Sequence, residues 1–112
     1  MTLHLNQATT FAALPQESSE SLMKKIQQAL LAGNRKVVIL DDDPTGTQTV
    51  HDVTVITAWS AEVLASALAD PEPALFVLTN TRAMTPDRAT AVNREIAENL
   101  LAASQKTGRS FV

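Results

Sequence analysis

Two polar segments of this sequence hold the side chains whose types and spacing are most suited to chemistry. The first, residues 41–52, carries four of the twelve acidic residues and neither lysine nor arginine. It follows the apolar run at residues 37–40, and the second segment, residues 79–82, follows another apolar run and ends at Arg82. If both runs are parallel strands, their tips lie at the edge where open α/β sheets bind ligands.

Carboxylates and a guanidinium at one edge have a defined chemistry. Carboxylate oxygens accept hydrogen bonds from sugar hydroxyls or hold Mg²⁺, and the planar fork of Arg82 matches a carboxylate or a phosphate. A polyhydroxy acid would satisfy both ends at once. Because adjacent carboxylates repel, one of them is a candidate for a raised pKa and a role as general base.

The alternative is a solvated acidic loop in which Asp41 or Asp43 caps a turn and Arg82 neutralises the charge. Adjacent parallel strands lie about 4.8 Å apart. We therefore expect a carboxylate oxygen of Asp42 or Asp43 within about 10 Å of the Arg82 guanidinium, near enough for a small acid or a few waters to bridge them.

Four strands are predicted to position these tips, at residues 37–40, 53–57, 74–79 and 109–112. The run at 37–40 is continuous and rich in β-branched residues, which is typical of a strand buried on both faces of a parallel sheet. A helix is predicted after Ser60, and a longer one begins with Thr85 as its N-cap and Pro86 at its first position. The alternation of strands and helices along the chain predicts an α/β fold, in which helices form layers on a parallel sheet.

The N-terminal part has a different pattern. Residues 1–17 have no clean period and are predicted to form an extended arm or a frayed terminus. A helix is predicted over residues 18–33, with Ser18 or Ser19 as its cap and a left-handed stop at residues 33–34.

Composition excludes several classes of protein. The 112 residues are 45% apolar, which excludes a mainly disordered chain. Their net charge is −3, and the sequence has no stripe of basic residues of the kind that binds nucleic acid. The absence of cysteine excludes disulfide scaffolds and cysteine-bound metals. No apolar run approaches the ~20 residues of a membrane span, and the first residues lack a secretory signal. We therefore expect a cytoplasmic protein.

The chain stops inside the strand predicted at residues 109–112. The simplest interpretation is an incomplete N-terminal domain of a longer α/β protein, with residues 1–17 as an arm and residues 18–112 as the domain. The alternative is a complete small domain with an edge strand at its end.

The acidic segment has one partial resemblance. Asp-x-Asp-x-Thr after an apolar strand resembles the first motif of haloacid-dehalogenase-type phosphatases, and Thr79 resembles their second motif. This resemblance implies that Asp41 is a nucleophile and Asp43 its acid/base partner, with Mg²⁺ between them. The downstream lysine and acidic motifs of that superfamily are not found in the sequence.

A second resemblance covers most of the chain. Residues 36–52, Lys-Val-Val-Ile-Leu-Asp-Asp-Asp-Pro-Thr-Gly-Thr-Gln-Thr-Val-His-Asp, resemble the opening of the four-carbon acid sugar kinase family, whose hallmark is Asp-Asp-x-Thr-Gly. Residues 80–84, Asn-Thr-Arg-Ala-Met, resemble its next element, and residues 11–15 resemble longer members. The sequence departs from many members at Thr49 and Asn80, where they have aspartate, which leaves the substrate open.

This second resemblance implies an ATP-dependent kinase of a small four-carbon sugar acid. Its substrate domain corresponds to residues 18–112, and its C-terminal nucleotide-binding domain is absent from this chain. ATP and Mg²⁺ are expected to serve the full-length protein, and neither is expected on this chain alone, which would be inactive. The expected partners are the sugar acid and the missing domain, and neither nucleic acid nor a membrane is expected. The chain is also expected to self-associate through the sheet edge at residues 111–112.

Carried over by position, the resemblance also implies site residues. Asp42, Asp43, Thr45 and Gly46 fall on Asp-Asp-x-Thr-Gly and are expected to bind substrate, and Arg82 is expected to clamp its carboxylate. Asp43 is the expected catalytic residue, and no metal ligand is expected. A non-catalytic small-acid-binding module is the remaining hypothesis.

Overall fold

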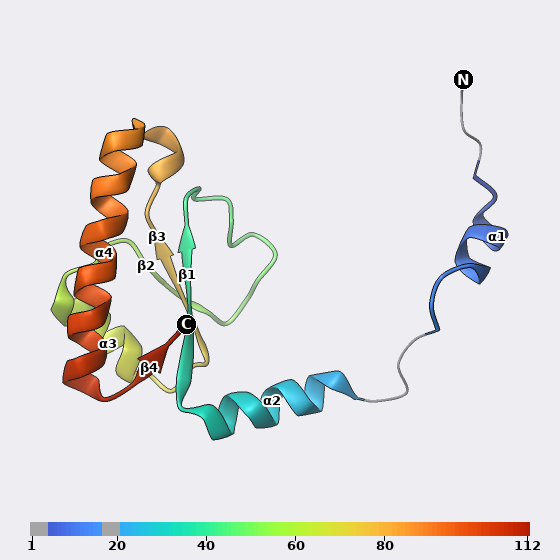
Figure 1. Cartoon of the computed structure of the whole chain (residues 1–112), viewed down its shortest axis with the longest axis horizontal. Helices are drawn as coiled ribbons and strands as arrows, with labels where there is room; N and C mark the ends of the chain where they lie inside the picture. Colours follow the sequence, from blue (N-terminus) through green and yellow to red (C-terminus); the bar gives the residue numbers. More distant parts are fainter. Residues whose placement is uncertain (1–4, 17–20) are drawn as a thin grey trace.

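The computed structural model describes residues 5–16 and 21–112, and it is an α/β structure. A parallel sheet forms its centre, with a loop between its first two strands and helices between the later ones (Figure 1). The elements, in chain order, are α1 (Gln7–Ala12), α2 (Leu22–Gly33), β1 (Arg35–Asp41), β2 (Thr54–Ile56), α3 (Ala61–Ala69), β3 (Ala74–Leu78), the 3₁₀ helix η1 (Thr81–Ala83), α4 (Pro86–Thr107) and β4 (Ser110–Phe111).

The four strands lie in the order β2-β3-β1-β4, and all their pairings are parallel. The predicted α/β fold is therefore confirmed. No strand separates β1 from β3, and their register pairs Asp41 with Leu78. The segments that follow these two strands therefore leave the same edge of the sheet side by side.

The connections of β1 and β3 diverge, because the chain moves along the sheet in opposite directions after them. The step from β1 to β2 runs one way, and the steps through α3 and α4 run the other way. Right-handed crossovers then place these connections on opposite faces. Figure 1 shows α3 and α4 together on one side of the sheet, and the loop at residues 42–53 leaving the tip of β1 on the other. The tips of β1 and β3 therefore lie where the direction of the connections reverses, which is the position at which open α/β sheets bind ligands.

The hydrophobic core lies between the sheet and the pair α3 and α4. Burial of large apolar side chains in this layer is the main driving force for the fold. The fully buried apolar residues of the layer are Leu64 and Leu68 from α3, Leu75 and Val77 from β3, and Ile96 from α4.

The prediction that β1 is buried on both faces is wrong. Val37, Val38 and Ile39 are half-buried, and Leu40 is 45% exposed. The reason is that α3 and α4 cover one face, whereas α1 and α2 contribute no buried residue among those described. The continuous apolar run correctly predicted a strand. It did not predict that helices cover only one face of that strand.

The N-terminal segment differs from the predicted extended arm. Residues 7–12 form the exposed helix α1, and the side chain of Asn6 caps it by accepting a hydrogen bond from the Thr9 amide at 3.2 Å. Ser18 and Ser19, predicted as caps of the next helix, lie outside the described residues, and Ser21 stands at the N-cap position of α2. The predicted left-handed stop is present, at Asn34 with φ of 44°.

The helices α3 and α4 begin where local signals predict. The Ser60 hydroxyl accepts a hydrogen bond from the Val63 amide at 3.3 Å. Thr85 is the N-cap of α4, Pro86 opens the helix, and Gly108 ends it in the left-handed conformation with φ of 69°. Within the described ranges, no helix has both the length and the apolar character needed to cross a membrane.

Candidate functional site

The tips of β1 and β3 are joined by Thr79, which is 2% exposed. Both its amide and its hydroxyl donate hydrogen bonds to the Asp41 carbonyl oxygen, at 2.8 and 3.0 Å. The Thr79 hydroxyl oxygen in turn accepts from the Thr81 amide at 3.3 Å. Because one buried hydroxyl connects both tips, Thr79 holds the two polar segments in a defined relation.

Arg82, after β3, lies against the loop that follows β1. Asn80 adopts the left-handed conformation, with φ of 54°, and turns the chain into η1. The guanidinium donates from Nε and Nη2 to the two carboxylate oxygens of Asp42, at 3.2 and 2.9 Å. Its Nη1 donates to Oδ2 of Asp43 at 2.7 Å. The predicted proximity is confirmed, and the contact is direct.

Asp43 is held on both sides of its carboxylate. While Oδ2 faces Arg82, Oδ1 accepts from the amide and the hydroxyl of Thr45, at 2.8 and 2.6 Å. The hydrogen bond from the Thr45 hydroxyl, followed by that from its amide and by the charge of Arg82, lowers the pKa of Asp43 from 3.8. Asp42, followed by Asp43, raises the pKa of Arg82. The raised carboxyl pKa expected from mutual repulsion is therefore wrong for Asp43, because these donors lower its pKa by more than desolvation raises it.

Gly46 allows the loop to close over Asp41. The Asp41 Oδ1 accepts from the Asp43 amide at 3.2 Å, and its Oδ2 is buried with no hydrogen-bond partner among the described residues. A Cβ built on Gly46 would lie 2.1 Å from that Oδ2. Position 46 therefore needs glycine for space. The same contact turns Asp41 into the loop, where it is poorly placed to attack a phosphoryl group as the phosphatase interpretation requires.

The cluster as a whole is acidic, with three carboxylates and one guanidinium. The side chains of Asp42 and Asp43 are 51% and 23% exposed, so their free lone pairs face solvent. They are acceptors for ligand hydroxyls. Mg²⁺ does not fit between Asp42 and Asp43, because the guanidinium occupies that place. The described ranges also contain no group of three or more His, Asp or Glu residues that could hold a metal ion.

The role of Thr79 in joining the two strand tips was not identified from the sequence, which placed this residue only in the polar tip of its strand and in the phosphatase resemblance. The alternative in which Asp41 or Asp43 caps a turn and Arg82 neutralises the charge is confirmed in its contacts, because both carboxylates accept from the amide two residues later and Arg82 pairs with the loop. The signal for Thr79 is a hydroxyl residue directly after a buried strand. His51 lies outside the cluster, with its Nδ1 2.7 Å from Asp52 and its side chain 93% exposed.

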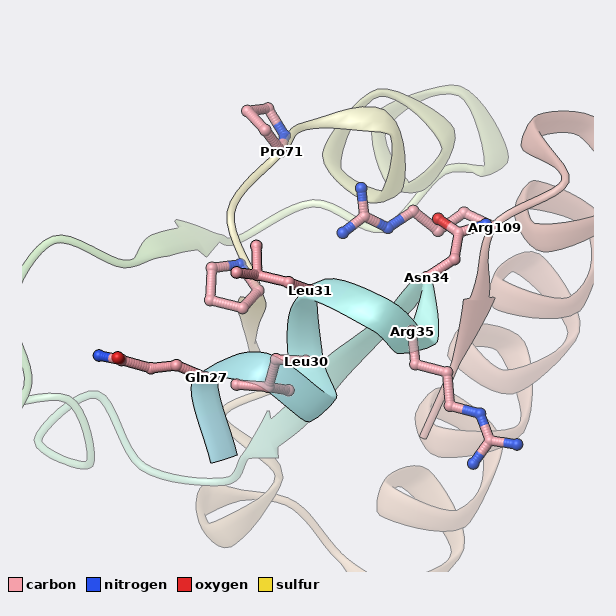
Figure 2. A pocket seen from close by; sticks show the side chains of 8 residues that line it. Gln27, Leu30, Leu31, Asn34, Arg35, Pro71 and Arg109 are labelled. Carbon is pink, nitrogen blue, oxygen red and sulfur yellow. The ribbon is translucent and has the colours of Figure 1, made fainter. Parts of the chain in front are cut away.

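A separate concavity lies at the other end of β1, beside Arg35. Figure 2 shows Leu31 of α2 on the side toward Pro71, with the Arg109 guanidinium reaching toward the gap between them and Arg35 pointing away. Since Arg35 and Asp41 are the two ends of β1, this concavity is distinct from the Asp–Arg cluster.

Comparison with known proteins adds one finding. Residues 37–112 match the family described as the sugar-binding N-terminal domain. No curated protein and no solved structure has a significant match to the chain. The match covers more than half of the chain and includes both strand tips and the loop with its carboxylates. The chain therefore belongs to the family of sugar-binding N-terminal domains.

Proposed function

We propose that the Asp–Arg cluster binds a small four-carbon sugar acid, and that the chain is the substrate-binding part of an ATP-dependent kinase. The observation that carries the proposal is the contact of the Arg82 guanidinium with Asp42 and Asp43 across two adjacent strand tips. Carboxylates recognise the hydroxyls of a sugar, and a guanidinium recognises its acid group. The family match supports a sugar ligand, and the motif resemblance supports the kinase and the acid.

Each residue has a role in this proposal. Asp42 and Asp43 accept hydrogen bonds from substrate hydroxyls, and Arg82 binds the substrate carboxylate. Thr45 and Gly46 shape the loop that presents these groups. Asp43 is the proposed catalytic residue: its lowered pKa keeps it ionised, ready to orient the attacking hydroxyl and accept its proton. Phosphoryl transfer depends mainly on positioning and charge stabilisation, so a weak base suffices.

ATP and Mg²⁺ would bind outside the residues described. The turn after β1 has a single glycine, Gly46, and therefore lacks the glycine-rich loop that cradles phosphates. We propose that residues 18–112 form the sugar-acid domain, that residues 1–17 precede it as a separate segment, and that a second domain binds the nucleotide. The proposed kinase works in the cytoplasm, where ATP is available.

Binding of threonate, a four-carbon sugar acid, tests the sugar-acid site. Calorimetric titration should show threonate binding to the wild type, and Arg82→Ala should weaken it by roughly 10- to 150-fold, because a charge-assisted bidentate contact of about 1.5–3 kcal/mol is lost. The alcohol threitol should lose much less, since it offers no carboxylate. Arg94→Ala, on the exposed surface of α4, is the matched control and should bind like the wild type. Equal losses for acid and alcohol would contradict the role of Arg82.

Kinase activity is tested on the complete product of the gene. Threonate-dependent release of ADP from ATP, lost in Asp43→Asn, is the expected result. The second candidate function is a non-catalytic small-acid-binding module, which the family match favours because it names sugar binding and no catalysis. Tight threonate binding without any ADP release from a panel of four-carbon sugar acids would select that module.

A further inference from the structure

We infer that a sugar acid enters the site by carboxylate exchange: its carboxylate replaces that of Asp42 on Arg82, while Asp43 remains on the guanidinium. This inference rests on the proposed function and adds the order of events and the origin of selectivity for an acid. Its basis is a difference between the two aspartates that hold Arg82.

Asp42 is the weakly held partner. Within the part of the chain that the structure describes, both hydrogen bonds of its carboxylate come from Arg82. Its side chain is 51% exposed and that of Arg82 is 64% exposed. Ion pairs between exposed side chains contribute little to stability, because water competes for both charges. An incoming carboxylate therefore has little to overcome at this contact.

Asp43 is the firmly held partner. Its side chain is 23% exposed, and the carboxylate oxygen that does not face Arg82 accepts two hydrogen bonds from Thr45. If Arg82 released Asp43, the hydrogen bonds from Thr45 would still hold the carboxylate beside the guanidinium. The ion pair between Asp43 and Arg82 would then form again readily. Asp43 consequently keeps the guanidinium in a fixed orientation at the strand tips.

The edge of the guanidinium that Asp42 occupies is the one a ligand needs. Nε and Nη2 donate two roughly parallel hydrogen bonds to Asp42, which is the geometry that any carboxylate adopts on arginine. Exchange preserves the number of charge-assisted hydrogen bonds on Arg82. It also frees the Asp42 carboxylate to accept the hydroxyls of the same ligand. The Arg82 amide donates to the Asp42 carbonyl at 3.2 Å, so the two residues stay neighbours when the side chains separate.

Asp42 is thereby a specificity-determining residue as well as a ligand-binding one. It competes with an incoming carboxylate for Arg82, and because the pair is exposed this competition is weak. A neutral sugar alcohol brings no charge to replace it and leaves Arg82 paired with Asp42. Only a ligand with both a carboxylate and hydroxyls can replace Asp42 on Arg82 and also bind the Asp42 carboxylate that this exchange frees.

The test uses butyrate, a carboxylate without hydroxyls, so that the exchange step is measured alone. Asp42→Asn should bind butyrate about 2- to 5-fold more tightly than the wild type, because the competing charge of an exposed ion pair is removed. Asp43→Asn is the matched variant and should show no such gain. Equal or weaker butyrate binding by Asp42→Asn, or a larger gain in Asp43→Asn, would overturn the exchange.

A second measurement needs no variant that might fail to fold. Carbon NMR of the wild-type carboxyl groups should show the Asp42 signal moving on saturation with butyrate, which has no hydroxyl for Asp43, while the Asp43 signal keeps its position. Both signals moving together would contradict the exchange even if butyrate binds. If threonate does not bind at all, the proposed function falls with it, whereas Arg82-dependent threonate binding without the Asp42 effects overturns the exchange alone.

Discussion

The contact between Asp41 and Gly46 is the condition on which the residue-level geometry of the site depends. Asp41 accepts hydrogen bonds from Thr79 through its main chain and from the Asp43 amide through its side chain, so it links the loop to both strand tips. The loop can close around that carboxylate only because position 46 has no side chain. The family hallmark at Gly46 thus has a steric reason that is independent of any ligand.

Gly46→Ala should therefore disturb the site. Its Cβ would lie 2.1 Å from the Asp41 Oδ2, so the loop or the carboxylate must move, and overpacking of this kind costs about 1–3 kcal/mol. We expect a lower free energy of unfolding in urea and weaker threonate binding. Gly33→Ala is the control, since a Cβ there meets nothing within 4 Å, and its helical position should keep or raise stability. Equal stability of the two variants would contradict this account.

At the scale of elements, the buried Lys36 joins β1 to the end of α3. Its ammonium donates hydrogen bonds to the carbonyl oxygens of Ala67 and Asp70, the latter at 3.0 Å, and lies 3.8 Å from the Asp70 carboxylate. Lys36 is fully buried. A cation at the C-terminus of a helix interacts favourably with the helix dipole and satisfies its last carbonyls. The lysine thus fixes where α3 meets the sheet, opposite the ligand edge.

Lys36→Met tests this connection, because methionine keeps the length of the side chain and removes the donor. Buried carbonyl oxygens would lose their partner, and the free energy of unfolding at pH 7 should fall by about 1–3 kcal/mol. Desolvation lowers the pKa of Lys36 from 10.5, although Asp70 opposes the shift. The folded state therefore releases this proton more readily than the unfolded state does.

The lowered pKa also sets the sign of the pH dependence. The stability of the wild type should rise as the pH increases through the folded pKa toward 10.5, and this contribution is lost again on lowering the pH. Urea unfolding at pH 7 and at pH 10 should show that rise in the wild type and a smaller one in Lys36→Met. Identical pH profiles would contradict a buried, charged Lys36.

At the scale of the whole molecule, the second half of β1 has no strand beside it on the side of β4 among the described residues. The two-residue strand β4 pairs with β1 at Arg35 and Lys36, and Val112 adds backbone hydrogen bonds with Lys36 and Val38, whereas β1 continues to Asp41. Beside this unpaired edge, between β1 and α4, lies an apolar groove. Exposed strand edges next to apolar surface favour association with another chain. The groove is lined by Val38, Leu40, Ala97, Leu100, Leu101, Phe111 and Val112.

We therefore expect the chain to self-associate through this edge. Sedimentation velocity should show the average mass rising with protein concentration. Leu101→Lys places a charge in the groove, where the leucine is 58% exposed, and should shift the chain toward monomer. Val63→Lys, on α3 and 36% exposed, is the matched control and should behave like the wild type. A wild-type chain that stays monomeric at every concentration would contradict the prediction.

Much of the fold could be predicted because its signals are local. Pro86 and Gly108 mark the limits of α4, Ser60 marks the start of α3, and the apolar runs mark the strands. Parallel pairing of β1 with β3 then brings Arg82 near the carboxylates, since tips of adjacent parallel strands share an edge. The sequence by itself therefore determined the α/β class, the order of the main elements and the place of the candidate site.

Other features depend on contacts between residues far apart in the chain, and only the tertiary structure decided them. The contacts of Arg82 with both Asp42 and Asp43 depend on how the segments after β1 and β3 meet, and the burial of Lys36 depends on where α3 ends. The lowered pKa of Asp43 comes from donors whose directions the loop sets. The exposed face of β1 depends on which helices pack on the sheet. Local propensity and spacing carry no information on such distances, because packing of the whole chain sets them.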